Sequence, residues 1–512
     1  MPPVALDCLA GRRGCRPLGQ LRDGARGMSA IKRSLGIAFL TQYAELVIQF
    51  VGLMFLARII TSEQVGIYSV AALLMALLHV FRDFGVAKYI IQSETLTVQE
   101  IRSSFGVAYL LAFSMALVLL ASSGAAARFY NEPQVKDILV VMSASFAITP
   151  VGSVLSAILR RNMQLKRLAA VRVGSTVCHV VVSLALAMLG YGAMSLAWAN
   201  FASIVSFGVL AALLRPAGVP FTPSFRKMRA ILSFGSISSL GNLVSVAGTN
   251  SPDVIIGKVI SLAATGYFSR GNGLVQMFKT LINGAIVPLV LPYFSQLRRD
   301  KADMVAPYRL AIAHLTGFAW PFFAVMALLA LPVVRTLYGP NWDVSVPIVR
   351  ILCLAGAVST LATFAGEVMI AYGHINKVTK MQLLTQPVRV LAVLGGAMFG
   401  LEAVAWSLVG AEAIALLLTS HFLKATTGVH LRGVLSASFK SAIVTVASAV
   451  GPALVVLAWP PHAPIWLWLQ LAAGGGAALA GWLVAIMLTG HPVKQHLQQA
   501  RLRYLPGAPW GK

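Results

Sequence analysis

The sequence contains little charge, and negative charge is the scarcest. Only 11% of its 512 residues are charged, and 16 acidic residues stand against 41 lysines and arginines, a formal net charge of +25. Soluble domains carry about 25% charged residues, so this composition disfavours a soluble enzyme, a disordered chain or a fibrous protein. In a soluble protein the basic excess would suggest nucleic-acid binding. Here the basic residues fall in short segments between apolar runs, which is typical of a membrane protein.

Cysteine is also scarce, and the familiar catalytic motifs are missing. The four cysteines are Cys8, Cys15, Cys178 and Cys353. Their spacing fits neither a disulfide framework nor a metal site. The sequence contains no P-loop and no HExxH motif. We therefore expect a protein that is not an enzyme and that binds no metal or cofactor.

Long apolar runs dominate what is present, and 58% of the residues are hydrophobic. We count about fourteen runs that approach the roughly 20 apolar residues needed to cross a membrane. They centre on residues 35–57, 65–91, 105–124, 138–159, 170–190, 193–214, 231–252, 266–294, 308–331, 344–372, 380–400, 402–423, 437–459 and 465–489. The sequence therefore predicts an all-α polytopic membrane protein.

The distribution of lysine and arginine predicts the orientation. With the N-terminus placed in the cytoplasm, roughly 32 of the basic residues fall in inside segments and about 6 in outside segments. A change of one in the helix count would destroy this alternation, so we predict an even number of spans with both termini cytoplasmic. Residues 1–28 are rich in Arg and Gly without an apolar core. We expect them to form a disordered tail, or to be an extension upstream of a true start at Met28.

Two segments of the sequence repeat each other. LARIITSEQVGIYS (56–69) aligns without a gap with IGKVISLAATGYFS (256–269), at an offset of 200. An even number of helices between the repeats makes them parallel, related by an axis along the membrane normal. We therefore predict two six-helix lobes around a central cavity, followed by two further helices. The predicted divisions are a tail (1–28), an N-lobe (29–225), a C-lobe (226–425), helices 13 and 14 (426–492) and a cytoplasmic tail (493–512).

Four segments resemble one family of membrane transporters. They are LARIITSEQVGIYS (56–69), ILRRNMQLKRLA (158–169), DVIIGKVISLAATGYFSRGNGL (253–274) and YGPNWDVSVPIVRILCLAG (338–356). They are similar to motifs of the polysaccharide transporter family, the Wzx-type flippases of the multidrug/oligosaccharidyl-lipid/polysaccharide superfamily. The resemblance implies a MATE/MOP-like fold.

The resemblance also implies a cargo and a location. The cargo would be an undecaprenyl-diphosphate-linked oligosaccharide repeat unit, moved outward across the bacterial cytoplasmic membrane for lipopolysaccharide O-antigen or exopolysaccharide synthesis. The implied partners are that lipid-linked sugar, membrane lipid and the polymerase and export proteins of the pathway, and not nucleic acid.

Polar residues on the first predicted helix share one face. Gln42, Glu45 and Gln49 follow the i, i+3, i+7 spacing of a helix, and Asn242 begins an equivalent face on the seventh. We expect both faces to line the central cavity, the alternative being helix–helix hydrogen bonds within one lobe.

The eighth predicted helix carries Asn272, Gln276, Lys279 and Asn283 on one face. Lys279 is a candidate for binding a phosphate. Arg270 lies about 180° away on a straight helix, unless nearby glycines unwind a turn. It would either face the cavity or extend toward the outer interface.

The remaining charged candidates have either structural or functional interpretations. Arg82 would anchor its lobe at the cytoplasmic rim, or meet the diphosphate where the substrate enters. Glu45 and Glu412 could bind a coupling ion, although a helix–helix hydrogen bond is an equal alternative for Glu412. Arg58 and Lys258 occupy equivalent outer ends and are interpreted as structural or exit-side charges.

Two other functions compete with a flippase. One is a MATE-like multidrug exporter, which the two additional helices disfavour. The other is a membrane glycosyltransferase or polymerase, which the short loop near 125–137 disfavours because it leaves no room for a sugar-binding domain.

Overall fold

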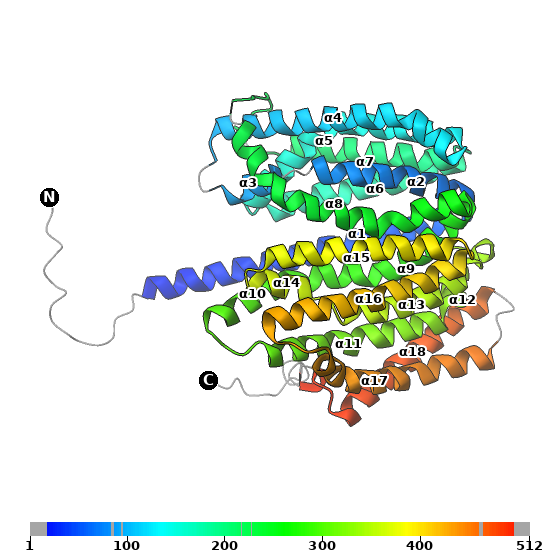
Figure 1. Cartoon of the computed structure of the whole chain (residues 1–512). Coiled ribbons are helices and arrows are strands. Elements are labelled where there is room, and N and C mark those ends of the chain that lie inside the picture. Colours follow the sequence, from blue (N-terminus) through cyan, green and yellow to red (C-terminus); the bar gives the residue numbers. More distant parts are fainter. Residues whose placement is uncertain are drawn as a thin grey trace, which may run out of the picture.

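A computed structural model describes residues 18–82, 86–93, 96–216, 218–226, 228–459 and 464–495. Over these residues the chain forms 18 α-helices, one short 3-10 helix and no β-strand (Figure 1). The helices of the first half are α1 (Leu18–Ile59), α2 (Ser62–Arg82), α3 (Val86–Gln92), α4 (Val98–Tyr130), α5 (Pro133–Arg161), α6 (Leu165–Met188) and α7 (Ala193–Leu213). Those of the second half are α8 (Met228–Val259), α9 (Leu262–Ala285), α10 (Val287–Arg299), α11 (Val305–Leu328), α12 (Ala330–Leu337), η1 (Pro340–Trp342), α13 (Ser345–Thr360), α14 (Ala365–Ala371), α15 (Ile375–Ala397) and α16 (Leu401–Thr427). A final pair is formed by α17 (Leu431–Ala458) and α18 (Pro464–Thr489).

Eleven helical segments among the described residues are long and apolar enough to cross a membrane. The chain is therefore an integral membrane protein, as predicted, but the predicted count of about fourteen spans is not confirmed. Helices α9 and α15 are about as long as their neighbours but lie outside the eleven. These two helices carry more polar and charged residues, and several of those residues belong to the site described below.

The two halves repeat one packing pattern. In the first half α1 packs along α6, and α6 and α5 pack along α7. In the second half α8 packs along α15, and α15 and α13 pack along α16. The pair α17 and α18 attaches to the second half through α11, below it in Figure 1. This correspondence agrees with the duplication predicted from the two repeat segments.

The repeat segments meet each other where the halves join, which we call the closed end (residues 60–66 and 260–266, at the right of Figure 1). A Cβ atom added to Gly66 would lie 1.8 Å from the carbonyl oxygen of Leu262. One added to Gly266 would lie 1.8 Å from the carbonyl oxygen of Ser62. The two contacts are related by the 200-residue offset, so an approximate twofold axis passes between α2 and α9. Only glycine allows the backbones this close.

Two cations also connect the halves at the closed end. The guanidinium of Arg58 donates to the carbonyl of Thr336, 3.0 Å away in the other half. Its repeat equivalent, Lys258, donates to the carbonyl of Phe129 and lies 4.6 Å from the centroid of that ring. Both contacts join one half to the other and are structural, and the prediction of structural or exit-side charges is not decided further by them.

The N-terminal helix begins earlier than predicted. Helix α1 starts at Leu18, inside the stretch predicted to be a disordered tail. Residues 18–39 are mostly good helix formers such as Leu, Arg, Ala and Lys, which continue the helix beyond its membrane-crossing part, Leu40–Ile59. Residues 1–17 and 496–512 lie outside the described part of the chain.

Candidate functional site

A polar pocket of about 510 Å³ lies between the halves, next to the closed end. Helices α1, α2, α6 and α7 of the first half line it, and α9 supplies the second half's contribution. Its polar lining residues are Gln49, Tyr68, Ser69, Thr176, His179, Ser183, Asn200, Ser203, Ser269 and Arg270. The hydroxyls of Ser69 and Ser269, which are repeat equivalents, are 3.2 Å apart and hydrogen-bonded. The pocket therefore borders the approximate twofold axis at this serine pair, where both halves can contact one ligand.

Arg270 is the cation of the polar pocket. Ser261 caps the start of α9 by accepting the N–H of Ala264 at 3.0 Å. Further along α9, Gly266 and Arg270 are four residues apart and therefore lie on one face of the helix. Because Gly266 packs against α2, Arg270 is directed toward the first half.

Within the described part of the chain, Arg270 has no counter-charge. Its Nε is buried without a hydrogen-bond partner, and none of the described carboxylates lies within ion-pair distance of it. A buried charge without a partner is costly. A bound anion would remove that cost, so the pocket has the chemistry of an anion site.

Trp342 supports Arg270 from the second half. The centre of the guanidinium lies 5.8 Å from the Trp342 ring centroid. The indole N–H donates to the carbonyl of Ala57 at 2.8 Å, across the junction between the halves. The ring is therefore fixed in place, and it gives Arg270 a cation–π contact but no negative charge.

Lys279 lies in a different, smaller pocket of about 150 Å³ within the second half. It is lined by α9, α11 and α13, and the hydroxyl residues Ser359, Thr360 and Thr363 contribute to its wall. Helix α9 is continuous from Leu262 to Ala285, so no turn unwinds to bring Arg270 to the same face. The two cations predicted on this helix therefore occupy separate pockets.

Each candidate ion-coupling carboxylate is paired with an arginine. Glu45 on α1 accepts from Arg172 on α6 at 2.8 Å. Glu412 on α16 forms an ion pair with Arg389 on α15, close enough to Lys279 for an electrostatic interaction. The sequence analysis named neither arginine as a site residue, although both fall within predicted runs (170–190 and 380–400). Helix α6 begins at Leu165 and α15 at Ile375, so each arginine lies inside its helix, and spacing along one helix does not specify a partner on another.

The other predicted site residues divide among several positions. Gln49 lines the polar pocket, and Gln42 is half-buried two turns earlier on α1. Gln276 donates to Asn272 at 3.4 Å, one turn away on the same helix. Three predicted side chains lie outside what the structure describes: Arg82, Asn242 and Asn283.

The polar wall supplied by α6 and α7 was not predicted. His179, Asn200 and Ser203 stand singly among apolar residues, and Thr176 follows only one other polar residue, Ser175. A lone polar residue in an apolar run is more often hydrogen-bonded within the protein than exposed to a ligand. Only the three-dimensional convergence of α1, α6, α7 and α9 identifies these residues as pocket lining.

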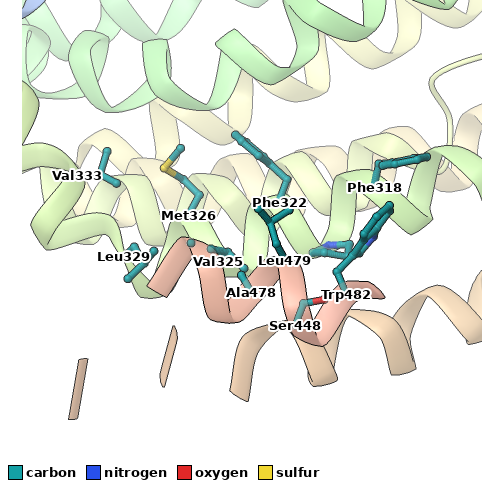
Figure 2. A pocket seen from close by; sticks show the side chains of 12 residues that line it. Phe318, Phe322, Val325, Met326, Leu329, Val333, Ser448, Ala478, Leu479 and Trp482 are labelled. Atoms are coloured by element: carbon teal, nitrogen blue, oxygen red, sulfur yellow. The ribbon is translucent and has the colours of Figure 1, made fainter. Parts of the chain in front are cut away.

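Apolar pockets continue along the second half. The first, of about 600 Å³, lies between α11 and α18 and is lined by Phe322 and Met326 of α11 and by Leu479 and Trp482 of α18 (Figure 2). The second, of about 570 Å³, lies between α9, α10 and α11 and shares Phe318 with the first. It also shares lining residues with the Lys279 pocket. The second apolar pocket therefore borders the pocket of Lys279.

The family comparison matches more than half of the chain. The model of the family described as "Polysaccharide biosynthesis protein" matches residues 55–347. This stretch contains both repeat segments, the closed end and most residues of the polar pocket.

Relatives of similar length also match. The chain is 25% identical to the succinoglycan biosynthesis transport protein ExoT of Rhizobium meliloti (strain 1021), over 65% of this chain and 68% of that protein. It is 21% identical to the lipopolysaccharide biosynthesis protein WzxC of Escherichia coli (strain K12), over 67% and 71% of the respective chains.

Solved structures share the fold. The lipid II flippase MurJ in an inward closed conformation aligns with a TM-score of 0.66 and 12% identity, over 88% of this chain and 99% of that one. An outward-facing multidrug resistance MATE family transporter of the MOP superfamily aligns with a TM-score of 0.52 and 15% identity, over 78% and 95%. The predicted MATE/MOP-like, all-helical fold is therefore confirmed.

Proposed function

The chain belongs to the polysaccharide biosynthesis protein family, and from that premise we propose that it is a flippase for a lipid-linked oligosaccharide. The proposed cargo is an undecaprenyl-diphosphate-linked repeat unit, moved from the cytoplasmic to the outer leaflet for lipopolysaccharide or exopolysaccharide assembly. The chain acts as a transporter and not as an enzyme.

The unpaired Arg270 in the polar pocket is the observation that carries this proposal. A diphosphate presents several acceptor oxygens and about two negative charges, and a guanidinium binds such groups through charge-assisted hydrogen bonds. Arg270 lies between the halves, where a ligand would have to pass. Lys279, which lies deeper in the second half, offers a second cation.

The rest of the site suits the other parts of the cargo. Glycan hydroxyls cannot cross hydrocarbon, because each unsatisfied polar group costs several kcal/mol there. The hydroxyl, amide and imidazole groups that line the polar pocket replace water for the sugar. The apolar pockets along α11 suit the polyprenyl tail.

Transport proceeds by rocking of the two halves about the polar pocket. The end of the bundle that holds residues 160–167 faces the cytoplasm, because it carries the excess of lysine and arginine. The closed end then faces outward in the inner membrane, and both termini are cytoplasmic. Outward movement of two negative charges gains up to about 4.6 kcal/mol per 100 mV of inside-negative potential.

The test is the fate of the cargo in cells that lack the protein. We expect undecaprenyl-diphosphate-linked repeat units to accumulate in the inner leaflet and surface polysaccharide to be lost. The wild-type gene should reverse the accumulation and restore the surface polysaccharide. Unchanged surface polysaccharide together with increased drug sensitivity would instead assign the chain to multidrug export.

A further inference from the structure

Asp253 is a carboxylate inside the helical bundle that has no partner among the described residues. Its Oδ1 is buried, and no hydrogen bond or ion pair reaches its side chain from the described residues. Glu45 and Glu412 each contact an arginine instead. Ionisation of Asp253 therefore costs more free energy than ionisation of Glu45 or Glu412, because no cation offsets its charge.

Asp253 lies on α8 where this helix bridges the halves. Helix α8 packs on α2 and α4 of the first half and on α9 and α15 of its own. Gly257, one turn further on, shows how tight this packing is. A Cβ added there would lie 3.0 Å from Val70 on α2, 3.1 Å from Thr265 on α9 and 3.4 Å from Tyr130 on α4.

The described groups around Asp253 supply no positive charge. Tyr130 is the ionisable residue that faces it, from α4. Helix α9 presents Thr265, whose hydroxyl donates to the backbone carbonyl of Asp253 and not to its carboxylate. Helix α2 presents the apolar Val70, and α15 approaches α8 near Gly248 through Gln386.

The nearest basic residue along α8 is committed elsewhere. Lys258 lies five residues beyond Asp253, and its ammonium donates to the carbonyl of Phe129. A carboxylate taken out of water without a counter-charge is more stable as the neutral acid. Packing of α2, α4 and α9 around α8 therefore favours protonated Asp253, and separation of these helices admits water and favours ionisation.

A proton fits this position better than a metal ion. Metal ions such as Ca²⁺ and Mg²⁺ require about six oxygen ligands. No group of three His, Cys, Asp or Glu residues among the described residues could hold a metal ion. A lone carboxyl group requires only a proton to become neutral.

We propose that Asp253 is the proton-binding site of the closed end, neutral while α2, α4, α8 and α9 are packed together and ionised when they separate. A proton taken up from the outer side then favours closure, which returns the empty carrier to the cytoplasmic side. This inference rests on the proposed function only in requiring that the closed end opens during transport.

The test measures opening of the closed end as a function of pH, without any lipid-linked sugar. Spin labels are placed on Leu189→Cys at the end of α6 and Met398→Cys at the end of α15, two residues that are 72% and 75% exposed. The native cysteines are replaced, and the distance distribution is recorded in lipid nanodiscs at about pH 5 and about pH 8. We expect the closed-to-open ratio to fall at least about tenfold over this range, which is the effect of one pKa unit.

Substitutions at Asp253 decide the assignment. Asp253→Asn is permanently neutral and should remain closed at both pH values, whereas Asp253→Glu should retain the pH response. The matched control Asp137→Asn removes an exposed carboxylate from the start of α5 and should leave the response unchanged.

Three results would overturn the proposal. The first is a pH-dependent closed-to-open ratio that persists in Asp253→Asn, and the second is no pH dependence in the spin-labelled protein that retains Asp253. The third is a closed-to-open ratio that changes with sodium concentration at fixed pH. Because the measurement contains no cargo, failure of the lipid-accumulation test leaves its outcome unaffected, and the two proposals can fail separately.

Discussion

Arg270 has opposite consequences for stability and for transport. Its buried Nε lacks a partner among the described residues, so the folded state carries the energetic cost of an isolated charge. The same isolation leaves the guanidinium available to an incoming diphosphate. A residue kept at a cost to stability is typical of a functional site.

Substitution of Arg270 separates the two effects. We expect Arg270→Gln to reduce transport about 10- to 100-fold, since a hydrogen bond to a charged group contributes about 1.5–3 kcal/mol. We expect its Tm in detergent to stay constant or to rise, because the unpaired charge is gone. Complementation of a deletion strain and thermal unfolding measure the two quantities.

Arg335→Gln is the matched control. Arg335 donates to both carboxylate oxygens of Asp343, at 3.0 and 2.7 Å. Its removal should lower the Tm slightly and leave transport intact. An Arg270→Gln variant that transports normally but unfolds at lower temperature would show that Arg270 is structural.

At the residue scale, helical spacing predicts which side chains share one face of a helix, but not which side chains of other helices contact them. The face of Gln49 and the presence of two cations on α9 follow from helical spacing alone. The Glu45–Arg172 pair joins residues 127 positions apart, and nothing in either helix specifies the other. The same applies to the lining from α6 and α7, which depends on how the helices converge.

At the scale of elements, the closed end depends on one crossing of α2 and α9. Gly66 and Gly266 allow each backbone to touch the other's helix start. The alignment of the repeats predicted that these glycines are equivalent, but not that they contact each other's segments. That contact requires the two lobes to be docked, which is a long-range property.

Alanine at either glycine tests this crossing. The added Cβ would lie 1.8 Å from a carbonyl oxygen in both Gly66→Ala and Gly266→Ala, so each variant should separate the closed end to a similar extent. Disulfide formation between Ser69→Cys and Ser269→Cys measures this, and we expect its yield to fall severalfold.

Gly273→Ala is the control, because a Cβ there would meet nothing within 4 Å. It should leave cross-linking unchanged and stabilise α9 by up to about 1 kcal/mol. Unequal effects of Gly66→Ala and Gly266→Ala would argue against the approximate twofold symmetry.

The attachment of α18 depends on a buried histidine just beyond its end. His491 is 1% exposed, and its Nδ1 accepts the N–H of Val493 at 3.3 Å. Its Nε2 lies 3.0 Å from the hydroxyl of Ser441 on α17. Burial, together with the nearby His314 and Lys440, lowers the pKa of His491 to about 4.

This histidine predicts a loss of stability in acid. The unfolded-state pKa is about 6.5, so between the two pKa values the unfolded chain binds a proton that the folded chain does not. The free energy of unfolding should be constant above about pH 6.5 and fall by up to about 3 kcal/mol as the pH falls toward 4. The Tm as a function of pH measures this.

His491→Gln should flatten this pH dependence, whereas substitution of the exposed His430 by Gln should leave it unchanged. An unaltered acid response in His491→Gln would assign the titration to another group.

At the scale of the whole molecule, composition and periodicity were sufficient for the fold class. Low charge and long apolar runs predicted a helical membrane protein, and the gapless repeat predicted two equivalent halves. The number of spans was less predictable, because α9 and α15 carry the polar residues that a central passage requires. Hydropathy alone treats such helices as poor spans.

The central claim is that a lipid-linked anionic sugar crosses the membrane between the two halves, in contact with Arg270. The most direct test places the purified protein in liposomes with a fluorescent undecaprenyl-diphosphate-linked oligosaccharide. Its appearance in the opposite leaflet is followed by an impermeant quencher. We predict protein-dependent flipping that Arg270→Gln slows at least about tenfold and that Arg335→Gln leaves unchanged. No acceleration over protein-free liposomes, or equal rates in wild type and Arg270→Gln, would contradict the account.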